Sequence, residues 1–209
     1  MRLLVVGASG RTGRILVDRA LERGHQVTAL DIEQGGDVLT REGLRVVAGD
    51  ILAPDTLPAA MEGIDAIVSL VSPHPRRNGR VYVEGTRNLT DAAARAGVPR
   101  IVVVSAQGAG VDPTRLTFFY RIVLKIPVVA RLYPDIARME TDLIARTDID
   151  WTIVRAAVLS DGPRTGRYRT NAGDVVSGGS RISRADLADF LITVVESAEY
   201  AKQRVAIAY

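Results

Sequence analysis

Three glycines spaced three residues apart follow the first apolar run of the chain. The run 3–6 leads directly into Gly7-Ala8-Ser9-Gly10-Arg11-Thr12-Gly13. Between a strand and a helix, a first glycine permits a tight bend, a second lets the backbone approach a pyrophosphate, and a third allows the helix to pack closely on the strand. The N–H groups that begin the helix then attract phosphate. The stretch therefore predicts a dinucleotide-binding loop, with a simple tight turn as the alternative, and its contact residues would be Gly7, Ser9, Gly10, Arg11, Thr12 and Gly13.

An acidic residue lies where the adenosine ribose of such a dinucleotide would bind. Asp31 ends the second apolar run, 18 residues after Gly13, and a carboxylate there can accept hydrogen bonds from the ribose hydroxyls. Because it would repel a 2′-phosphate, Asp31 favours NAD(H). Arg11 and Arg14 could each pair with an extra phosphate, which keeps NADP(H) open. The alternative for Asp31 is a solvated loop carboxylate.

Two more groups of candidate cofactor residues follow later apolar runs. Asp50 and Ile51 come directly after the third run, where a carboxylate and the next backbone N–H can contact the adenine edge. Leu70, Val71 and Ser72 come at the end of the fourth run and would flank the adenosine and the pyrophosphate. We expect all of these residues to line one cofactor site.

Apolar runs alternate with helical patterns along the chain. Seven runs predict strands, at 3–6, 25–30, 44–48, 66–70, 100–104, 151–154 and 205–208, and continuous β-branched runs are typical of strands buried on both faces. Helices are expected at 11–23, 54–61, 80–96, 135–146 with Pro134 at its start, and from the N-cap Ser183 to about 197. The segment 116–132 is apolar, basic and broken by Pro127, and 161–179 is expected to be a loop. The alternation predicts one domain, 1–209, with an open, doubly wound, mostly parallel α/β sheet that carries helices on both faces.

The substrate pocket should lie at the carboxyl ends of these strands, mainly within 105–180. Ser105 ends the fifth strand, where the nicotinamide would lie, and its hydroxyl could donate a hydrogen bond to a substrate or to the nicotinamide amide. The alternative is a hydroxyl that bonds only to local backbone. We expect the pocket to be bounded also by the 107–110 loop and the 120–133 region, with mostly apolar walls from Val111, Phe118, Phe119 and Val158.

Composition narrows the class of protein. Hydrophobic residues make up 47% of the 209, enough for a substantial core, and the chain has no cysteine, which excludes disulfides and thiolate metal sites. Its two histidines are far apart in sequence, so no metal is expected. The net charge of +3 comes from 27 basic and 24 acidic residues, which are interspersed, and aromatic residues are 5%, so neither nucleic acid nor a membrane is an expected partner. A cytoplasmic protein that acts on a small molecule is the expectation.

Several motifs together resemble a known family. The glycine pattern, Gly49-Asp50-Ile51, Val103-Val104-Ser105 and Trp151-Thr152-Ile153-Val154-Arg155 look like the atypical short-chain dehydrogenase/reductases. More narrowly, the chain resembles the NAD(P)H-binding group that contains NmrA-like proteins and biliverdin-IXβ reductase/flavin reductase, over nearly its whole length. The resemblance implies a Rossmann-like fold, places Ser105 on the reductase's active-site serine and Arg155 at the cofactor site, and puts Val158 where the reductase has its histidine.

The tyrosine–lysine pair of standard short-chain dehydrogenases is out of register here. That pair has the spacing Y-x-x-x-K, whereas Tyr120 and Lys125 are five residues apart. On a regular helix, side chains four apart are about 40° apart and side chains five apart about 140°, so these two cannot form the pair. Tyr120 remains a candidate catalytic residue with a smaller role than Ser105, the alternative being an amphipathic helix whose basic side chains extend to solvent.

The expected activity follows from this combination. Hydride transfer needs mainly positioning, because the nicotinamide supplies the chemistry, and a flavin or quinone can take its proton from water. We therefore expect an NAD(P)H-dependent oxidoreductase that reduces a flavin, a quinone or another flat hydrophobic acceptor. The alternatives are a non-catalytic redox sensor that binds the dinucleotide and a redox-neutral isomerase or epimerase. The segment 116–132 is expected to cap the pocket or to form a homodimer contact.

Overall fold

A mostly parallel sheet forms the centre of the molecule. The computed structural model describes residues 1–32, 41–72, 79–112 and 118–209, the side chains of 118 and 119 excepted. The strand order is β3-β2-β1-β4-β5-β6-β10-β8, and only the β10–β8 pair is antiparallel. The strands are β1 (Arg2–Val6), β2 (Gln26–Asp31), β3 (Leu44–Ala48), β4 (Ala66–Ser69), β5 (Arg100–Ala106), β6 (Asp150–Ala156), β8 (Arg169–Asn171) and β10 (Gln203–Ala208). A second small sheet pairs β7 (Val158–Ser160) with β9 (Arg181–Ser183).

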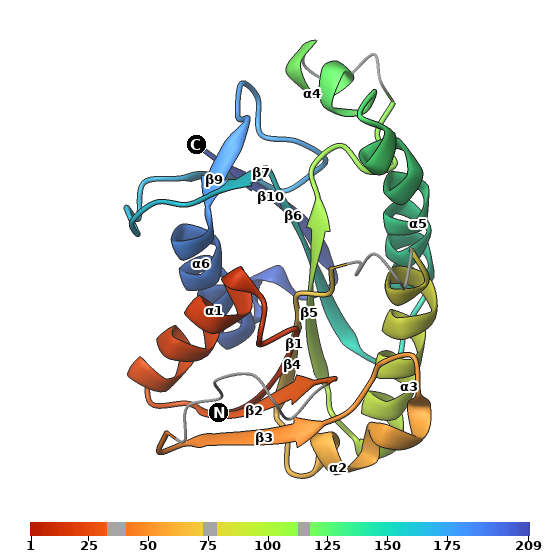
Figure 1. Cartoon of the computed structure of the whole chain (residues 1–209), viewed down its shortest axis with the longest axis vertical. Coiled ribbons are helices and arrows are strands. Elements are labelled where there is room, and N and C mark those ends of the chain that lie inside the picture. The colour runs from red at the N-terminus through yellow and green to blue at the C-terminus, as the bar shows by residue number, and fades with distance from the viewer. Residues whose placement is uncertain (33–40, 73–78, 113–117) are drawn as a thin grey trace.

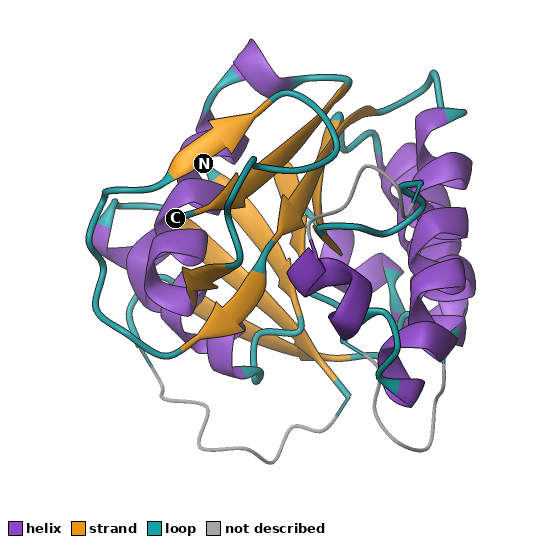
Figure 2. Cartoon of the chain, turned by 90° about the horizontal axis from the view of Figure 1, so that it is seen from above, coloured by secondary structure: helices purple, strands orange, loops and turns teal. Residues whose placement is uncertain are grey.

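Helices cover both faces of the large sheet (Figures 1 and 2). On one face lie α1 (Arg11–Glu22) and α6 (Arg184–Glu196); on the other lie α2 (Pro58–Met61), α3 (Thr86–Ala96) and α5 (Pro127–Ile144). Alternate residues of one strand enter the two cores: Leu3 and Val5 pack on the α1–α6 side, and Leu4 and Val6 on the α3–α5 side. Because both faces are buried, the strands are continuous apolar runs. The doubly wound α/β fold is confirmed.

Proline positions decide where the long helix of the second face begins. The predicted start of this helix at Pro134 is wrong: α5 begins at Pro127 and contains Pro134 in its interior. At the first helical position a proline loses no hydrogen bond, since that N–H has no partner within the helix. The predicted break at Pro127 does separate α5 from the short helix α4 (Phe118–Val123), which extends beyond the body of the molecule in Figure 1.

Other boundaries differ in smaller ways. The helix expected at 80–96 is a π-helical turn (Val81–Gly85) followed by α3, and the helix expected at 54–61 is a 3-10 turn (Pro54–Thr56) followed by α2. The expected loop 161–179 contains the short strand β8. The predicted N-cap is confirmed, because the Ser183 hydroxyl accepts from the Asp186 N–H at 3.0 Å.

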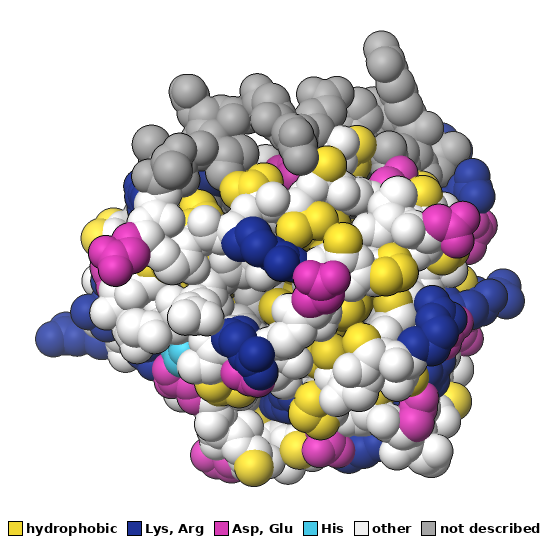
Figure 3. Space-filling view, turned by 90° about the horizontal axis from the view of Figure 1, so that it is seen from below, with side chains coloured by type: hydrophobic (Ala, Val, Ile, Leu, Met, Phe, Trp, Pro, Cys, Tyr) yellow, Lys and Arg dark blue, Asp and Glu magenta, His cyan; other side chains and the backbone are white. Residues whose placement is uncertain are grey.

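The surface mixes charges of both signs. On the face shown in Figure 3, basic and acidic side chains alternate around small apolar areas. None of the described helices combines the length and the apolar character needed to cross a membrane.

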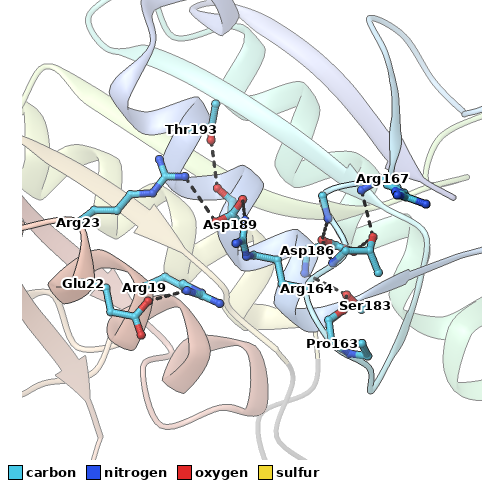
Figure 4. A network of polar contacts seen from close by, with 12 residues as sticks. Arg19, Glu22, Arg23, Pro163, Arg164, Arg167, Ser183, Asp186, Asp189 and Thr193 are labelled. Carbon is cyan, nitrogen blue, oxygen red and sulfur yellow. Dashed lines mark hydrogen bonds and ion pairs between the residues drawn. The ribbon is translucent and has the colours of Figure 1, made fainter.

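A polar network ties α1 to α6 and to the loop before β8 (Figure 4). Asp189 of α6 pairs with Arg23, which follows α1, at 3.4 Å and with Arg164 of the loop at 3.6 Å. Asp186, one turn earlier on α6, accepts hydrogen bonds from the backbone N–H groups of Thr165 and Gly166, each at 2.8 Å. These contacts fix the loop beside the carboxyl ends of the strands.

Candidate functional site

A cleft opens at the carboxyl ends of the central strands. Its main part is a cavity of about 420 Å³, and a smaller pocket of about 100 Å³ adjoins it. Gly7, Val71 and Ser72 line both, so the two form one continuous cleft. The main cavity brings together, from the residues expected in a cofactor site, Gly7, Gly10, Arg11, Thr12, Gly13, Leu70, Val71, Ser72 and Ser105; the smaller pocket adds Asp31, Asp50 and Ile51.

The glycine loop has the geometry that its spacing predicts. Gly7 has a φ of +82°, and a Cβ there would lie 2.8 Å from the Leu70 carbonyl oxygen. A Cβ on Gly13 would lie 2.1 Å from the Gly7 carbonyl oxygen, so only glycine lets α1 pack this closely on the loop. Gly10 is the N-cap of α1, and no described side chain caps this end. The first N–H groups of α1 therefore lie at the cavity without a side-chain cap, an arrangement that suits an anion.

Two carboxylates lie at the other end of the cleft. Asp31 ends β2, and its Oδ1 accepts from the Ile32 N–H at 2.8 Å. Asp50 follows β3, and its Oδ1 accepts from the Leu52 N–H at 3.0 Å. Both carboxylates line the smaller pocket, where a carboxylate can accept several hydrogen bonds. Ser9, also expected to contact the cofactor, is exposed outside the lining, where its carbonyl accepts from Arg14 at 3.0 Å.

Ser105 lies on β5 at the base of the main cavity and is 6% exposed. Its hydroxyl contacts Oε1 of Glu140, a residue of α5 that is 3% exposed. Glu140 is also paired with Arg155, so its carboxylate is in the acceptor-only form and the shared proton belongs to Ser105. The expectation that Ser105 donates to a ligand therefore differs from the structure, in which that proton is directed at Glu140.

Arg155 lies beneath the cavity wall and does not line the cavity. It is 2% exposed on β6, and its guanidinium contacts Glu140 through Nε and Nη2 and Asp174 through Nη1, the last at 2.7 Å. With every guanidinium nitrogen engaged in this way, the expected contact of Arg155 with the cofactor does not fit the structure. Sequence reasoning did not single out Glu140, because no local motif joins α5 to β6.

Tyr120, the tyrosine expected to act in catalysis, does not line the cavity, whereas Tyr133, the last residue of the expected 120–133 boundary, does. Tyr120 is 1% exposed and packs in a separate apolar cluster with Val111, Leu124 and Val175, where burial raises its pKa. Tyr82 and Tyr133 line the cavity instead. Burial, followed by the proximity of Tyr133 and Asp135, raises the pKa of Tyr82 to about 12. Tyr133 donates to the Gln107 carbonyl at 3.3 Å, and burial raises its pKa as well.

The inner walls of the cavity are mostly apolar. Val158, which is 43% exposed, lines it as expected, whereas Val111 packs on Tyr120. The side chains of Phe118 and Phe119 lie outside the described residues. Of the segment 116–132, no described residue lines the cavity, and Ile122, Ile126 and Val128 are exposed. The other apolar lining residues here are Val104, Ala106, Ile136, Ala156, Ala157, Leu159 and Leu187.

Two arginines flank the cavity near the glycine loop. Arg11 and Arg184 both line it, and both pair with Asp161, Arg184 at 2.7 Å to Oδ1 and Arg11 to Oδ2. Two positive charges against one negative charge leave this region electropositive, which suits a pyrophosphate. Sequence reasoning placed Arg11 at the cofactor site but not Arg184, because Arg184 begins α6, far from the glycine loop in sequence.

The chain is similar to several known proteins over most of its length. The chain is 31% identical over 166 residues to the photosystem II assembly factor Ycf39 of Synechocystis sp., covering 78% of this chain and 46% of that protein. It thus spans about half the length of that relative. It is 28% identical to the uncharacterized protein YwnB of Bacillus subtilis, covering 98% and 95% of the two chains. The structure of ChuY, an anaerobilin reductase from Escherichia coli O157:H7, superposes with a TM-score of 0.83 at 21% identity, covering 100% and 97%.

A sequence model of the family described as NAD(P)H-binding matches residues 7–198. The matched range begins at the first glycine of the loop and includes every residue of the cleft named above. The chain therefore belongs to this NAD(P)H-binding family, as the resemblance found in the sequence implied.

Proposed function

We propose that this protein is an NAD(P)H-dependent oxidoreductase that transfers hydride to a flat, largely apolar acceptor such as a flavin or a quinone. The observation that carries the proposal is the continuous cleft, which runs from Asp31 past the glycine loop to Ser105 and ends between apolar walls. A dinucleotide whose ribose binds at Asp31 and whose pyrophosphate binds at the glycine loop would bring its nicotinamide to Ser105. An apolar cavity beside it suits a flat hydrophobic acceptor.

The proposed reaction requires the protein mainly to position the cofactor and the acceptor. A nicotinamide held beside Ser105 would supply the hydride and water would supply the proton, so that the protein would need no strong acid here. Ile136, Val158 and Leu159 would hold the acceptor against the nicotinamide face, and such alignment of the two reactants is itself a large contribution to rate.

An acceptor panel tests the proposal. The purified protein is mixed with NADH or NADPH and with flavins and quinones in turn, and oxidation of the reduced nicotinamide is followed by absorbance. We expect steady turnover with at least one flavin or quinone. If none of the acceptors is reduced while the dinucleotide binds, the redox-sensor or redox-neutral function replaces the proposed one.

Asp31 should set the choice of cofactor. We expect NADH to bind at least about tenfold more tightly than NADPH, about 1.4 kcal/mol, because the carboxylate repels a 2′-phosphate. Asp31→Asn should narrow that ratio. Asp50→Asn is the matched control, since Asp50 lies in the same pocket and both cofactors carry the same adenine. Titration calorimetry gives the dissociation constants of both cofactors for each variant. Tighter binding of NADPH than of NADH by the wild type would contradict the role given to Asp31.

Substitutions of Tyr120 and of Tyr133 should differ in their effect on turnover. Tyr120→Phe should leave kcat/KM within about twofold, because Tyr120 packs outside the cavity. Tyr133→Phe should lower it by about two- to tenfold, since it removes a hydroxyl from the cavity lining. Steady-state kinetics with one accepted substrate compares them. An inactive Tyr120→Phe beside a normal Tyr133→Phe would show that a mechanism centred on Tyr120 operates.

A further inference from the structure

A buried chain of polar side chains lies directly behind the cavity wall. It runs from Ser105 on β5 to Glu140 on α5, to Arg155 on β6 and to Asp174 before β9. The first three are 6%, 3% and 2% exposed, and only Ser105 lines the cavity. Charges taken out of water are costly unless they are paired and hydrogen-bonded, so the arrangement holds each group in one orientation.

This chain fixes the direction of the Ser105 hydroxyl. Arg155 approaches Glu140 with Nε at 3.0 Å from Oε1 and with Nη2 at Oε2. A carboxylate that accepts from a guanidinium has no proton to give, and a serine hydroxyl has one proton and two lone pairs. The Ser105 hydroxyl therefore donates its proton to Glu140. Toward the cavity, the Ser105 oxygen can only accept hydrogen bonds through its lone pairs.

We propose that Glu140 is a positioning residue that makes Ser105 a hydrogen-bond acceptor, so that the cavity selects a bound group carrying an N–H or O–H donor at this point. The proposal rests on the proposed function, because it assigns the ligand chemistry of the same cavity. Two sources carry such a donor: the carboxamide of the nicotinamide and an N–H of the acceptor, such as the imide of a flavin. In either case Ser105 orients its partner and does not protonate it.

Glu140→Gln tests the proposal because it should reverse the direction of the hydrogen bond between residue 140 and Ser105. Arg155 Nη2 and Nε both reach Oε2, Nε at 3.2 Å, so the glutamine oxygen should stay there and accept from both. Its NH2 should then take the Oε1 position, where Nε gives up its second bond and the Ser105 hydroxyl can turn to accept. That NH2 donates to Ser105, whose proton is then turned toward the cavity. Asp174→Asn is the matched control, because it also neutralises a partner of Arg155 but does not contact Ser105.

The cofactor arm needs no turnover. Dissociation constants are measured for NADH and for its reduced 3-acetylpyridine analogue, in which a methyl group replaces the carboxamide NH2. If the carboxamide is the donor, the wild type and Asp174→Asn should prefer NADH by about five- to tenfold. Ser105→Ala should bring the ratio within about twofold of unity, and Glu140→Gln should do the same or reverse it.

The acceptor arm compares lumiflavin with 3-methyllumiflavin, which lacks the imide N–H, at saturating NADH. If the flavin is the donor, the ratio of kcat/KM for lumiflavin to that for 3-methyllumiflavin should be high in the wild type and Asp174→Asn and near unity or reversed in Ser105→Ala and Glu140→Gln. The ratio of dissociation constants for the two cofactors should then be the same in all four proteins. If neither a flavin nor a quinone is reduced, the proposed function fails, and the cofactor arm alone decides on Ser105.

The proposal is overturned if neither ratio changes in Ser105→Ala, or if Glu140→Gln behaves as Asp174→Asn does, which would leave Glu140 a purely structural role. Circular dichroism verifies that each variant is folded. Should Glu140→Gln be unfolded, Glu140→Asp replaces it: the shorter side chain keeps the charge near Arg155 but withdraws the carboxylate from Ser105, and the same loss of discrimination is expected.

Discussion

Replacing Gly10 with valine is expected to weaken dinucleotide binding by more than about a hundredfold, or about 2.7 kcal/mol, while leaving the chain folded. Gly10 has a φ of −66° and a ψ of 162°, an extended conformation that any residue adopts. A Cβ there would meet only the Gly7 carbonyl oxygen, at 3.2 Å. The added side chain would instead occupy the place where a pyrophosphate must approach the N-terminus of α1.

Two other glycines serve as comparisons. Gly173→Ala should bind normally, because its Cβ would meet only the Asn171 side chain, at an ordinary 3.5 Å. Gly13→Val should lose both binding and stability, since its Cβ would lie 2.1 Å from one backbone oxygen and 2.8 Å from the Ala8 Cα. Titration calorimetry with NADH and NADPH measures the binding. A folded Gly10→Val protein with unchanged affinity would refute the phosphate-binding role of the loop.

The parts of the fold that the sequence predicted are those that depend on neighbours along the chain. A strand buried on both faces must be apolar throughout. The loop that packs α1 on β1 must have a glycine at position 13, because no larger residue fits there. The alternation of strands and helices then restricts the topology to a doubly wound sheet. Pro134 was misread because a proline that fits the first turn of a helix can also lie inside a longer one, where packing of Ile136 and Met139 stabilises the helix around it.

The parts of the site that the sequence did not predict depend on neighbours in space. Ser105 was found because it ends a strand, but its partner Glu140 lies 35 residues later on another element. Arg155 was expected at the cofactor from the family resemblance; only the packed structure shows that Glu140 and Asp174 occupy its guanidinium. Tyr82 and Tyr133 carry no motif, so their common position at the cavity could not be read from spacing.

Asp186→Ala is expected to lower the free energy of unfolding by about 3 kcal/mol, because it removes the acceptor of four hydrogen bonds that hold the 163–166 loop and Tyr209. Asp186 is fully buried in the first turn of α6. Its Oδ1 accepts from the Thr165 and Gly166 N–H groups, and its Oδ2 from the hydroxyls of Thr165 at 2.7 Å and Tyr209 at 2.6 Å. Asp186→Asn should cost only about 1 kcal/mol, since its oxygen can still accept from the two N–H groups and the hydroxyls can turn to accept from its NH2.

The same pair of variants predicts a dependence on pH. Burial pushes the pKa of Asp186 upward, but hydrogen bonds from Tyr209, Gly166 and Thr165 outweigh it and leave the pKa below its usual value. A carboxylate with a lowered pKa contributes stability that is fully present above the ordinary value of about 3.9 and is lost as the pH falls through the folded-state pKa. Urea unfolding should therefore show a constant gap between wild type and Asp186→Asn above about pH 5 that shrinks below about pH 4. A gap that stayed constant on acidification, or an Asp186→Ala variant as stable as wild type, would show that Asp186 does not hold the 163–166 loop beside the cleft.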